Sequence, residues 1–455
     1  MFHRFSQSPV ASIVTSFCAG ILALVVTIDS AQSRSLSLIR DAEIETIIGS
    51  YAAPLFAAAG LDPGAVDIKI INSADVNAFV AGGQRVFIFT GLLLAADNPN
   101  EVKGVIAHEV GHIAGGHLAR LHDRLRKANS QAIVSTLIGL AAAIGAGASG
   151  AGAAVISGGQ QLAQRSLLQY SRTQESAADQ AGIGYLNATE TSPHGLLNFL
   201  EKLGDQEVLL TNRQDSYLLT HPLARERVAL LRDQVSRSRY SNVQESAEEL
   251  SDFERLKAKL GGFLNKPSKT FRQYPASDQS PPARYARSIA HHKSANFAAA
   301  LGEIDSLIAE FSNDPFYHEL KGQILFESGR VAEAIGPLAQ AVDLLPRAPM
   351  LRFGLARAQI ATNDAGQNRA AIDHLRTVVD RDRDSTGAWQ QLAVAYGRDG
   401  QLGLSALSSA EFNIRVGRKR DAKHHAGGAS RLLAQGSPGW LRAQDIEFTA
   451  GKKRK

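Results

Sequence analysis

The 455-residue sequence predicts a mainly α-helical protein with a small β-sheet, in which a compact domain precedes an α-solenoid of helical repeats. Three observations lead to this prediction. Strand-like stretches surround Gly82-Gly83, an H-E-x-x-H motif occupies residues 108–112, and small residues recur about every 34 positions after residue 282. The apolar fraction of 44% and the charged fraction of 20% are ordinary for a folded protein.

Residues 1–31 are predicted to be a signal peptide. Arg4 precedes an uncharged run from Phe5 to Ile28, and Ala31 is a small residue suited to cleavage. The run is long for a signal, so an uncleaved membrane anchor is the alternative. Either segment would export the body of the protein. The single cysteine, Cys18, lies in this run, which excludes disulfides, cysteine-ligated zinc and a cysteine nucleophile elsewhere in the sequence.

Residues 36–264 are predicted to form the first domain. Apolar residues at helical spacing indicate a helix from about Leu36 to Ala59, and Val66–Ile71 alternates like a strand. Asn77–Thr90 is typical of a hairpin that turns at Gly82-Gly83. Such a hairpin can hold an extended substrate at the sheet edge, or it can simply belong to the sheet core.

A clear helix start precedes the H-E-x-x-H motif. Asn98 is a good N-cap, Pro99 suits the first helical position, and Glu101 suits the third. Gly111 lies inside this helix, where glycine costs about 1 kcal/mol relative to alanine. We therefore expect another segment to pack closely against the backbone at Gly111.

The motif itself predicts a zinc site. Residues four apart lie on one face of a helix, so His108 and His112 can bind the same Zn²⁺. Glu109 is then placed beside the metal, where it can take a proton from zinc-bound water. The spacing thus indicates a metal-dependent hydrolase with one zinc ion per chain.

A catalytic zinc ion takes a third protein ligand. Glu175 suits this role because Asp179, one turn later, can accept a hydrogen bond from the outer N–H of a zinc-bound histidine. The metzincin alternative, suggested by His117, fails because its third histidine would fall on Leu118. It also lacks a Met-turn, since the only methionine after Met1 is Met350, within the repeats. We interpret His117 as a residue that packs beside the site.

The segment Ile133–Ile156 is rich in alanine, glycine and isoleucine, and no charged residue occurs from Ala128 to Gln164. We expect a flap or a pair of helices close to the active site, with a membrane-associated segment as the alternative. Further helices are predicted at Gln160–Leu186, directly after Thr220-His221-Pro222, and at Val243–Leu264.

Residues 265–282 are polar and contain proline, so they are predicted to be a linker. Residues 283–436 are predicted to be tetratricopeptide repeats. Small residues recur there at spacings of about 34, 37 and 34, at Ala300, Ala334, Ala371 and Ser405. Small side chains at these positions let paired helices approach closely.

Residues 437–455 are predicted to be a basic tail. From Arg415 to Lys455 there are eleven Lys/Arg and three Asp/Glu, whereas the whole chain has a net charge of +5. Such an end can bind anionic lipid or acidic protein surfaces. Nucleic acid is not an expected partner of an exported protein, and a solvated tail is the simplest interpretation.

Taken together, three groups of residues resemble the gluzincin metallopeptidases related to the CAAX prenyl protease and the heat-shock protease HtpX. They are the motif at residues 108–112, the pattern Ser171-Arg172-x-x-Glu175-x-x-x-Asp179, and His221-Pro222 with Arg227. The export signal and the repeats extend the resemblance to exported members of this family over nearly the whole chain after the signal. It implies a zincin-type metallopeptidase domain ahead of the repeats.

The resemblance also implies roles for individual side chains. His108, His112 and Glu175 would be the zinc ligands, and Glu109 the general base. The carboxylate of Asp179 would lie behind the ligands. His221 would stabilise the oxyanion of the reaction, or occupy the open metal position and silence the site. Arg227 would anchor the loop of His221 or the carboxylates.

The function implied is that of a periplasmic zinc endopeptidase that degrades misfolded or stalled outer-membrane proteins. The repeats would dock on the outer-membrane assembly machinery, and peripheral membrane contact is a further expectation. The alternative is a chaperone or scaffold whose repeats do the main work while the protease site stays largely latent.

Overall fold

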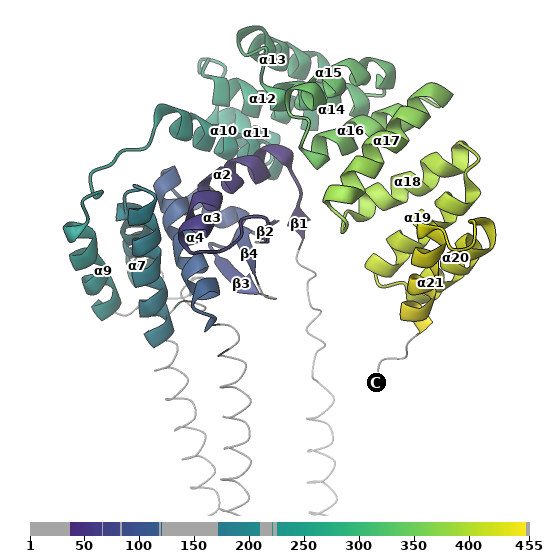
Figure 1. Ribbon diagram of the computed structural model, residues 1–455. Coiled ribbons are helices and arrows are strands. Elements are labelled where there is room, and N and C mark those ends of the chain that lie inside the picture. The colour runs from purple at the N-terminus through teal and green to yellow at the C-terminus, as the bar shows by residue number, and fades with distance from the viewer. Residues whose placement is uncertain are drawn as a thin grey trace, which may run out of the picture. The chain divides into compact units, whose positions relative to one another are not determined.

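The computed structural model describes residues 37–65, 67–81, 84–117, 120, 172–209, 221 and 225–451 (Figure 1). The predicted signal peptide, residues 1–31, and the small-residue segment Ile133–Ile156 lie outside the described residues, as do Gly82-Gly83 and Pro222. A mainly helical fold with a small sheet is confirmed. Among the helices that the structure describes, none has both the length and the apolar character needed to cross a membrane.

Four short strands form a mixed sheet in the order β1-β2-β4-β3. Their bounds are Leu38–Ile39, Asp67–Ile71, Ala78–Ala81 and Arg85–Phe89 for β1 to β4. β4 pairs in parallel with β2, whereas β3 and β4 are antiparallel, which confirms the predicted hairpin. The rings of Phe79 and Phe87 stack across that hairpin with centroids 4.9 Å apart. β3 is therefore an edge strand of this sheet.

The expected helix from Leu36 begins later than predicted. Leu38 and Ile39 form β1, whose backbone pairs with β2. The side chain of Asp41 accepts a hydrogen bond from the Ile44 amide and caps helix α2 (Ala42–Ala58). The apolar spacing of these residues suits either structure, and the cap decides where the helix starts.

Helix α3 (Thr90–Ala95) follows the sheet, and helix α4 (Pro99–Ala114) carries the H-E-x-x-H motif. The Asn98 side chain accepts a hydrogen bond from the Glu101 amide at 3.0 Å, and Pro99 begins the helix, as predicted. Every residue from Pro99 to His112 is buried. The motif therefore lies on a central helix of the domain.

Two glycines let other helices approach α4 closely. A Cβ at Gly104 would lie 2.4 Å from the amide nitrogen of Leu196 in helix α7 (His194–Leu209). A Cβ at Gly111 would lie 2.7 Å from the carbonyl oxygen of Ala178, in the helix of residues 172–188. The close packing predicted at Gly111 is therefore confirmed, and it involves the helix that carries Glu175.

Two helices complete this part of the chain, α9 (Arg225–Arg237) and α10 (Ala247–Leu264). The latter begins four residues after the predicted start because Ser246 and Glu249 form a capping box. The predicted linker, residues 265–282, is not entirely irregular. It contains helix α11 (Pro267–Gln273), on which Thr270 is fully buried.

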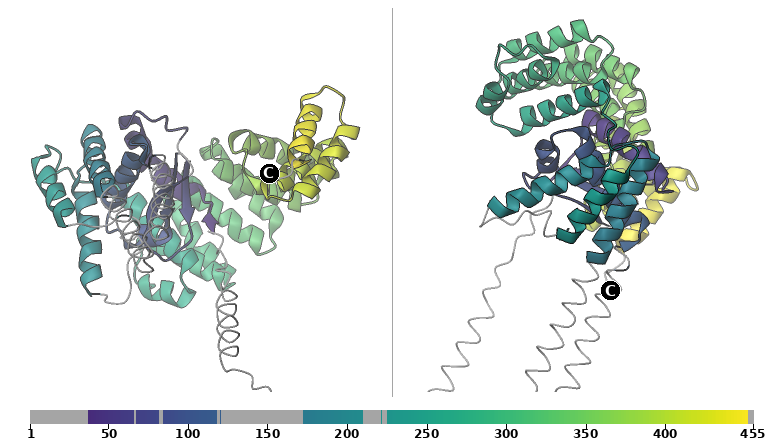
Figure 2. Two further views of the ribbon diagram at one scale, coloured as in Figure 1. Left: turned by 90° about the horizontal axis from the view of Figure 1, so that it is seen from below. Right: turned by 90° about the vertical axis from the view of Figure 1, so that its left-hand side faces the viewer.

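Ten helices described after α11 form the repeat region (Figure 2). They are α12 (Pro281–Lys293), α13 (Phe297–Glu310), α14 (Pro315–Glu327), α15 (Val331–Leu344), α16 (Pro349–Ala361), α17 (Ala365–Arg381), α18 (Thr386–Arg398), α19 (Leu402–Arg415), α20 (Lys419–Leu432) and α21 (Pro438–Gly451). Consecutive helices pack on each other. Ala300, Ala334 and Ala371 are fully buried between them, as the repeat pattern requires.

The C-terminal region differs from the predicted tail. Residues from Pro438 to Gly451 form helix α21, which packs on α20 and buries Ala443 and Ile446. The prediction followed the basic composition of this segment and did not account for the few apolar residues that pack it against the repeats. Residues 452–455 lie outside the described residues.

A buried charged cluster joins α2 and α10 to the first repeats. Glu43 of α2 is fully buried and accepts a hydrogen bond from the hydroxyl of Tyr285 in α12 at 2.7 Å. It also pairs with Arg255 at 2.5 Å and with Lys259 at 3.0 Å, both on α10. Arg255 pairs in turn with Asp314, the N-cap of α14. Since an unpaired buried charge is strongly unfavourable, these contacts hold the repeats against the helices that support α4.

Candidate metal centre and catalytic site

Four buried side chains converge beside α4. His108 and His112 come from α4, Glu175 from the helix of residues 172–188, and His221 from the chain before α9. One ligand atom from each lies within 4.8 Å of all the others. The helix of residues 172–188 can bring Glu175 this close because Gly111 has no side chain.

The two motif histidines point the same ring atom into this cluster. Their Nε2 atoms are 3.0 Å apart. Glu175 places one carboxylate oxygen 3.3 Å from Nε2 of His108 and the other 3.4 Å from Nε2 of His112. Nδ1 of His221 lies 3.1 Å from Glu175 Oε2 and 3.3 Å from His108 Nε2. All four side chains thus direct a possible metal ligand at one small volume.

The outer nitrogens of the motif histidines have separate partners. His108 Nδ1 lies 2.8 Å from an oxygen of Asp179, and His112 Nδ1 lies 2.9 Å from Nδ1 of His117. These contacts orient both rings so that Nε2 faces the centre. His117 therefore packs against a motif histidine, in agreement with the sequence interpretation.

Arg227 of α9 joins two carboxylates of the site. Its Nε and Nη2 donate to Asp179 at 2.5 and 2.8 Å, and its Nη1 lies 3.0 Å from Glu175 Oε2. The guanidinium is buried, so it holds both carboxylates with little competition from water. Arg227 was expected to anchor either the loop of His221 or the carboxylates. The contacts given above are with the carboxylates of Asp179 and Glu175.

Glu109 is the unusual member of the cluster. Its side chain is fully buried, yet neither carboxylate oxygen has a hydrogen-bond partner among the described residues. Oε1 lies 3.3 Å from Nε2 of His221. An unsatisfied buried carboxylate is costly, so its presence indicates a position for water or another polar group beside it.

Hydrogen bonds across the cluster shift its pKa values. Burial lowers the pKa of His108, but its hydrogen bonds to Asp179 and Glu175 outweigh burial and raise the pKa to about 9. Burial alone would raise the pKa of Glu175, but hydrogen bonds with His108, His112 and His221 bring it well below its usual range. Burial also lowers the pKa of His112. Glu175 is therefore an anion next to imidazole nitrogens.

This donor set fits a metal ion. Two imidazole nitrogens and a carboxylate oxygen face one volume, their outer atoms are already bonded, and a buried carboxylate lies next to them. A bound cation would also compensate the anionic carboxylate of Glu175. His221 provides a fourth donor at the same place.

The site adjoins the edge strand β3. Nε2 of His221 lies 3.3 Å from the carbonyl oxygen of Ala78, the first residue of β3. Sequence reasoning did not identify this contact, since a backbone carbonyl leaves no residue-type signal. The placement of His221 among the ligands also depends on long-range folding that no local pattern reveals.

The residues of this site lie within a region that matches a known protein family. Residues 38–235 match the sequence profile of Peptidase family M48. The chain is 28% identical over 426 residues to the beta-barrel assembly-enhancing protease of Escherichia coli (strain K12), covering 86% of this chain and 84% of that protein. The chain is 26% identical over 380 residues to the beta-barrel assembly-enhancing protease of Yersinia pestis, covering 81% of this chain and 75% of that protein. The metalloprotease LoiP of E. coli (strain K12) is 33% identical over 174 residues, which are 38% of this chain and 63% of that protein.

Proposed function

Residues 38–235 of this chain are a peptidase domain of family M48, as the sequence motifs suggested, and from this we propose that the protein is a zinc-dependent endopeptidase. In this proposal His108, His112 and Glu175 bind one zinc ion per chain, and Glu109 is the general base. The observation that carries it is the convergence of these buried side chains around one volume.

The chemistry follows from the placement of Glu109. When bound, zinc supplies Lewis acidity to the scissile carbonyl and to the attacking water. Glu109 takes a proton from that water and later gives it to the leaving amine. Its oxygens accept no hydrogen bond from the described residues, but Nε2 of His221 lies 3.3 Å from Oε1, so His221 has to move away before Glu109 can take the proton. Asp179 and Arg227 act through the ligands, because they orient His108 and Glu175.

We also propose that His221 keeps the resting site closed. The sequence left two roles open, oxyanion stabilisation and silencing of the metal. The position of His221 Nδ1 among the ligand atoms, with Nε2 next to Glu109, supports silencing. Access to the fourth metal position then requires His221 to move away. This arrangement also supports the second candidate function, a chaperone or scaffold with a largely latent protease site.

The edge strand β3 is the proposed seat of an extended substrate. Its outer side faces no other strand among the described residues, and its first residue, Ala78, contacts His221. A peptide that adds to β3 would gain main-chain hydrogen bonds next to the metal centre. Displacement of His221 from the carbonyl of Ala78 would then accompany substrate binding.

The biological role that we propose follows the relatives that span most of the chain. They are named beta-barrel assembly-enhancing proteases. We propose that this protein is exported to the periplasm, that it degrades misfolded or stalled outer-membrane proteins, and that its repeats dock on the outer-membrane assembly machinery, where the protein contacts the membrane surface peripherally. Helical repeats suit docking because they offer an extended surface.

Cleavage of casein tests the enzymatic proposal. We expect the wild type to cleave casein, a chelator to stop cleavage, and added zinc to restore it. Glu109→Gln should lose activity by orders of magnitude, while Glu248→Gln, at an exposed position of α10, should behave as the wild type. Cleavage by Glu109→Gln at the wild-type rate would contradict the proposed base.

A further inference from the structure

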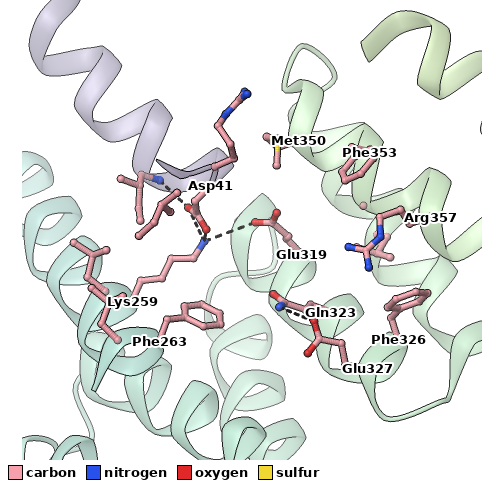
Figure 3. A pocket seen from close by; sticks show the side chains of 17 residues that line it. Asp41, Lys259, Phe263, Glu319, Gln323, Phe326, Glu327, Met350, Phe353 and Arg357 are labelled. Atoms are coloured by element: carbon pink, nitrogen blue, oxygen red, sulfur yellow. Dashed lines mark hydrogen bonds and ion pairs between the residues drawn. The ribbon is translucent and has the colours of Figure 1, made fainter. Parts of the chain in front are cut away.

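A cavity of about 330 Å³ lies where the repeats meet α2 and α10 (Figure 3). Its walls come from β1 and the start of α2, the end of α10, and helices α14, α15 and α16. Its volume is at the lower end of the roughly 300–1,000 Å³ typical of ligand pockets. It does not include any residue of the proposed metal centre.

One wall of the cavity is aromatic. Phe263, Phe326 and Phe353 line it from α10, α14 and α16, and Met350 adds a thioether. All four side chains are only half-buried, so they are reachable from the cavity. Three phenyl rings and a methionine form a surface that suits another aromatic side chain.

Arg357 covers this aromatic wall. Its guanidinium carbon lies 5.2 Å from the ring centroid of Phe326 and 5.8 Å from that of Phe353. Within the described part of the chain, no ion pair involves Arg357, and its side chain is exposed at the cavity. Its donors are therefore available to an incoming carbonyl group.

The remaining polar side chains balance in charge. Lys259 pairs with Asp41 at 2.8 Å and lies 3.8 Å from Glu319 (Figure 3). The amide of Gln323 donates to Glu327 at 3.0 Å. Burial raises the pKa of Glu319 to about 8, so the side chains that are charged at neutral pH and line the cavity are Arg40, Lys259, Arg357, Asp41 and Glu327. The additional cation, Arg40, pairs with Glu45 and Asp382, which are not part of the cavity wall.

We propose that this cavity binds an aromatic side chain of an extended, unfolded polypeptide segment. The phenyl wall would hold the ring. Arg357 would donate to a carbonyl oxygen of a neighbouring peptide unit, and the side-chain oxygen of Gln323 would accept from a peptide N–H, whereas both oxygens of Glu327 already contact Gln323 and His292. A lining of balanced charge suits an uncharged peptide backbone better than a fatty-acid carboxylate or an anionic headgroup. The inference rests on the proposed function, since it assigns the anchoring site of an unfolded client.

The position of the cavity gives this anchoring a use. α2 and α10 line it, and both helices also pack on α4. Lys103 of α4 forms an ion pair with Glu249 of α10. A client anchored here is therefore held on the same rigid elements that carry the H-E-x-x-H motif, which raises its effective concentration at the protease site.

Gly354 allows a direct test, because it lines the cavity. A Cβ at this position would meet only Leu338 Cδ2, at 3.7 Å, so a larger side chain can grow into the cavity without striking the backbone. Gly354→Met should fill the site. Gly302→Met is the matched control, since Gly302 is helical, exposed, free of neighbours within 4 Å and absent from the cavity wall.

Binding is measured with full-length protein carrying Glu109→Gln, so that no peptide is cleaved. The probe is a fluorescein-labelled 15-residue peptide of glycine and serine with two phenylalanines, and its partner has alanine in their place. We expect the phenylalanine peptide to bind more tightly. Gly354→Met should weaken that binding at least tenfold, and Gly302→Met should leave it unchanged. Phe353→Leu, which keeps an apolar side chain, should weaken it severalfold.

Equal affinity of the phenylalanine peptide for Gly354→Met and Gly302→Met would overturn the proposal. The proposal is also overturned if Gly354→Met loses the binding of dodecanoate but keeps the binding of the phenylalanine peptide. That result would assign the cavity to an acyl chain. If the phenylalanine peptide binds no more tightly than the alanine peptide, while casein cleavage still depends on Glu109, this inference fails and the proposed protease function stands. Selective peptide binding without any such cleavage removes the proposed protease function and leaves the cavity assignment in place.

Discussion

Replacing Gly111 with alanine should loosen the metal site while leaving the protein folded. The added Cβ would lie 2.7 Å from the carbonyl oxygen of Ala178, about 0.7 Å inside ordinary contact distance. Because both groups belong to backbones of packed helices, α4 and the helix of residues 172–188 must move apart by about this much. Glu175 lies one turn before Ala178, so it moves away from His112.

The magnitude follows from two opposing effects. Overpacking in a buried contact costs about 1–3 kcal/mol. Alanine regains about 1 kcal/mol over glycine in a helix interior. The net loss of unfolding free energy is therefore about 0–2 kcal/mol. Metal sites tolerate displacements of only about 0.5 Å, so we expect the zinc affinity of Gly111→Ala to fall by at least tenfold.

Competition with a zinc chelator measures the affinity, and thermal unfolding measures the stability. Gly184→Ala is the matched control, because Gly184 lies on the helix of residues 172–188 with no atom within 4 Å of its would-be Cβ. That variant should bind zinc as the wild type does and should melt at the same temperature or slightly higher. Wild-type zinc affinity in Gly111→Ala would refute the reasoning that close helix packing sets the ligand geometry.

Three further outcomes are expected. Arg227→Lys keeps the charge but loses the simultaneous contacts to Asp179 and Glu175, so its zinc affinity should fall about 10–100-fold in the same competition assay; an unchanged affinity would argue against a positioning role. His221→Ala should raise the rate of casein cleavage severalfold if His221 closes the site, whereas a fall in rate would assign it to the oxyanion. In protein stripped of metal, the pKa of His108 is raised to about 9, above its ordinary 6.5. The stability that His108 contributes is thus present below about pH 6.5 and is lost as the pH rises through 9. The difference in melting temperature between the metal-free wild type and metal-free His108→Gln should therefore shrink over that range. A difference that grew with pH would contradict the assignment.

The sequence was most informative where the relevant interactions are local. The helix of the H-E-x-x-H motif was predictable because Asn98 and Pro99 define its start within a few residues of the histidines. Gly111 signalled a close neighbour because glycine in a helix needs such a reason. The buried alanines of the repeats were predictable from their period alone.

Other features depend on contacts that no short pattern contains. β1 forms because Leu38 and Ile39 pair with β2, about 30 residues away in the chain, after Asp41 has capped α2. The buried charged cluster around Glu43 combines residues from α2, α10, α12 and α14. The cavity beside it combines residues more than 300 positions apart, so it could be found only in the folded chain.

The central claim is that His108, His112 and Glu175 hold one zinc ion and that Glu109 acts beside it. Elemental analysis of the metal content, together with casein cleavage by the same preparations, tests this most directly. We predict one zinc ion per chain in the wild type and in Glu109→Gln, with cleavage only in the former, and loss of both zinc and cleavage in His112→Ala. A wild type that cleaves casein without bound zinc, or a Glu109→Gln variant that cleaves it as fast as the wild type, would contradict the account.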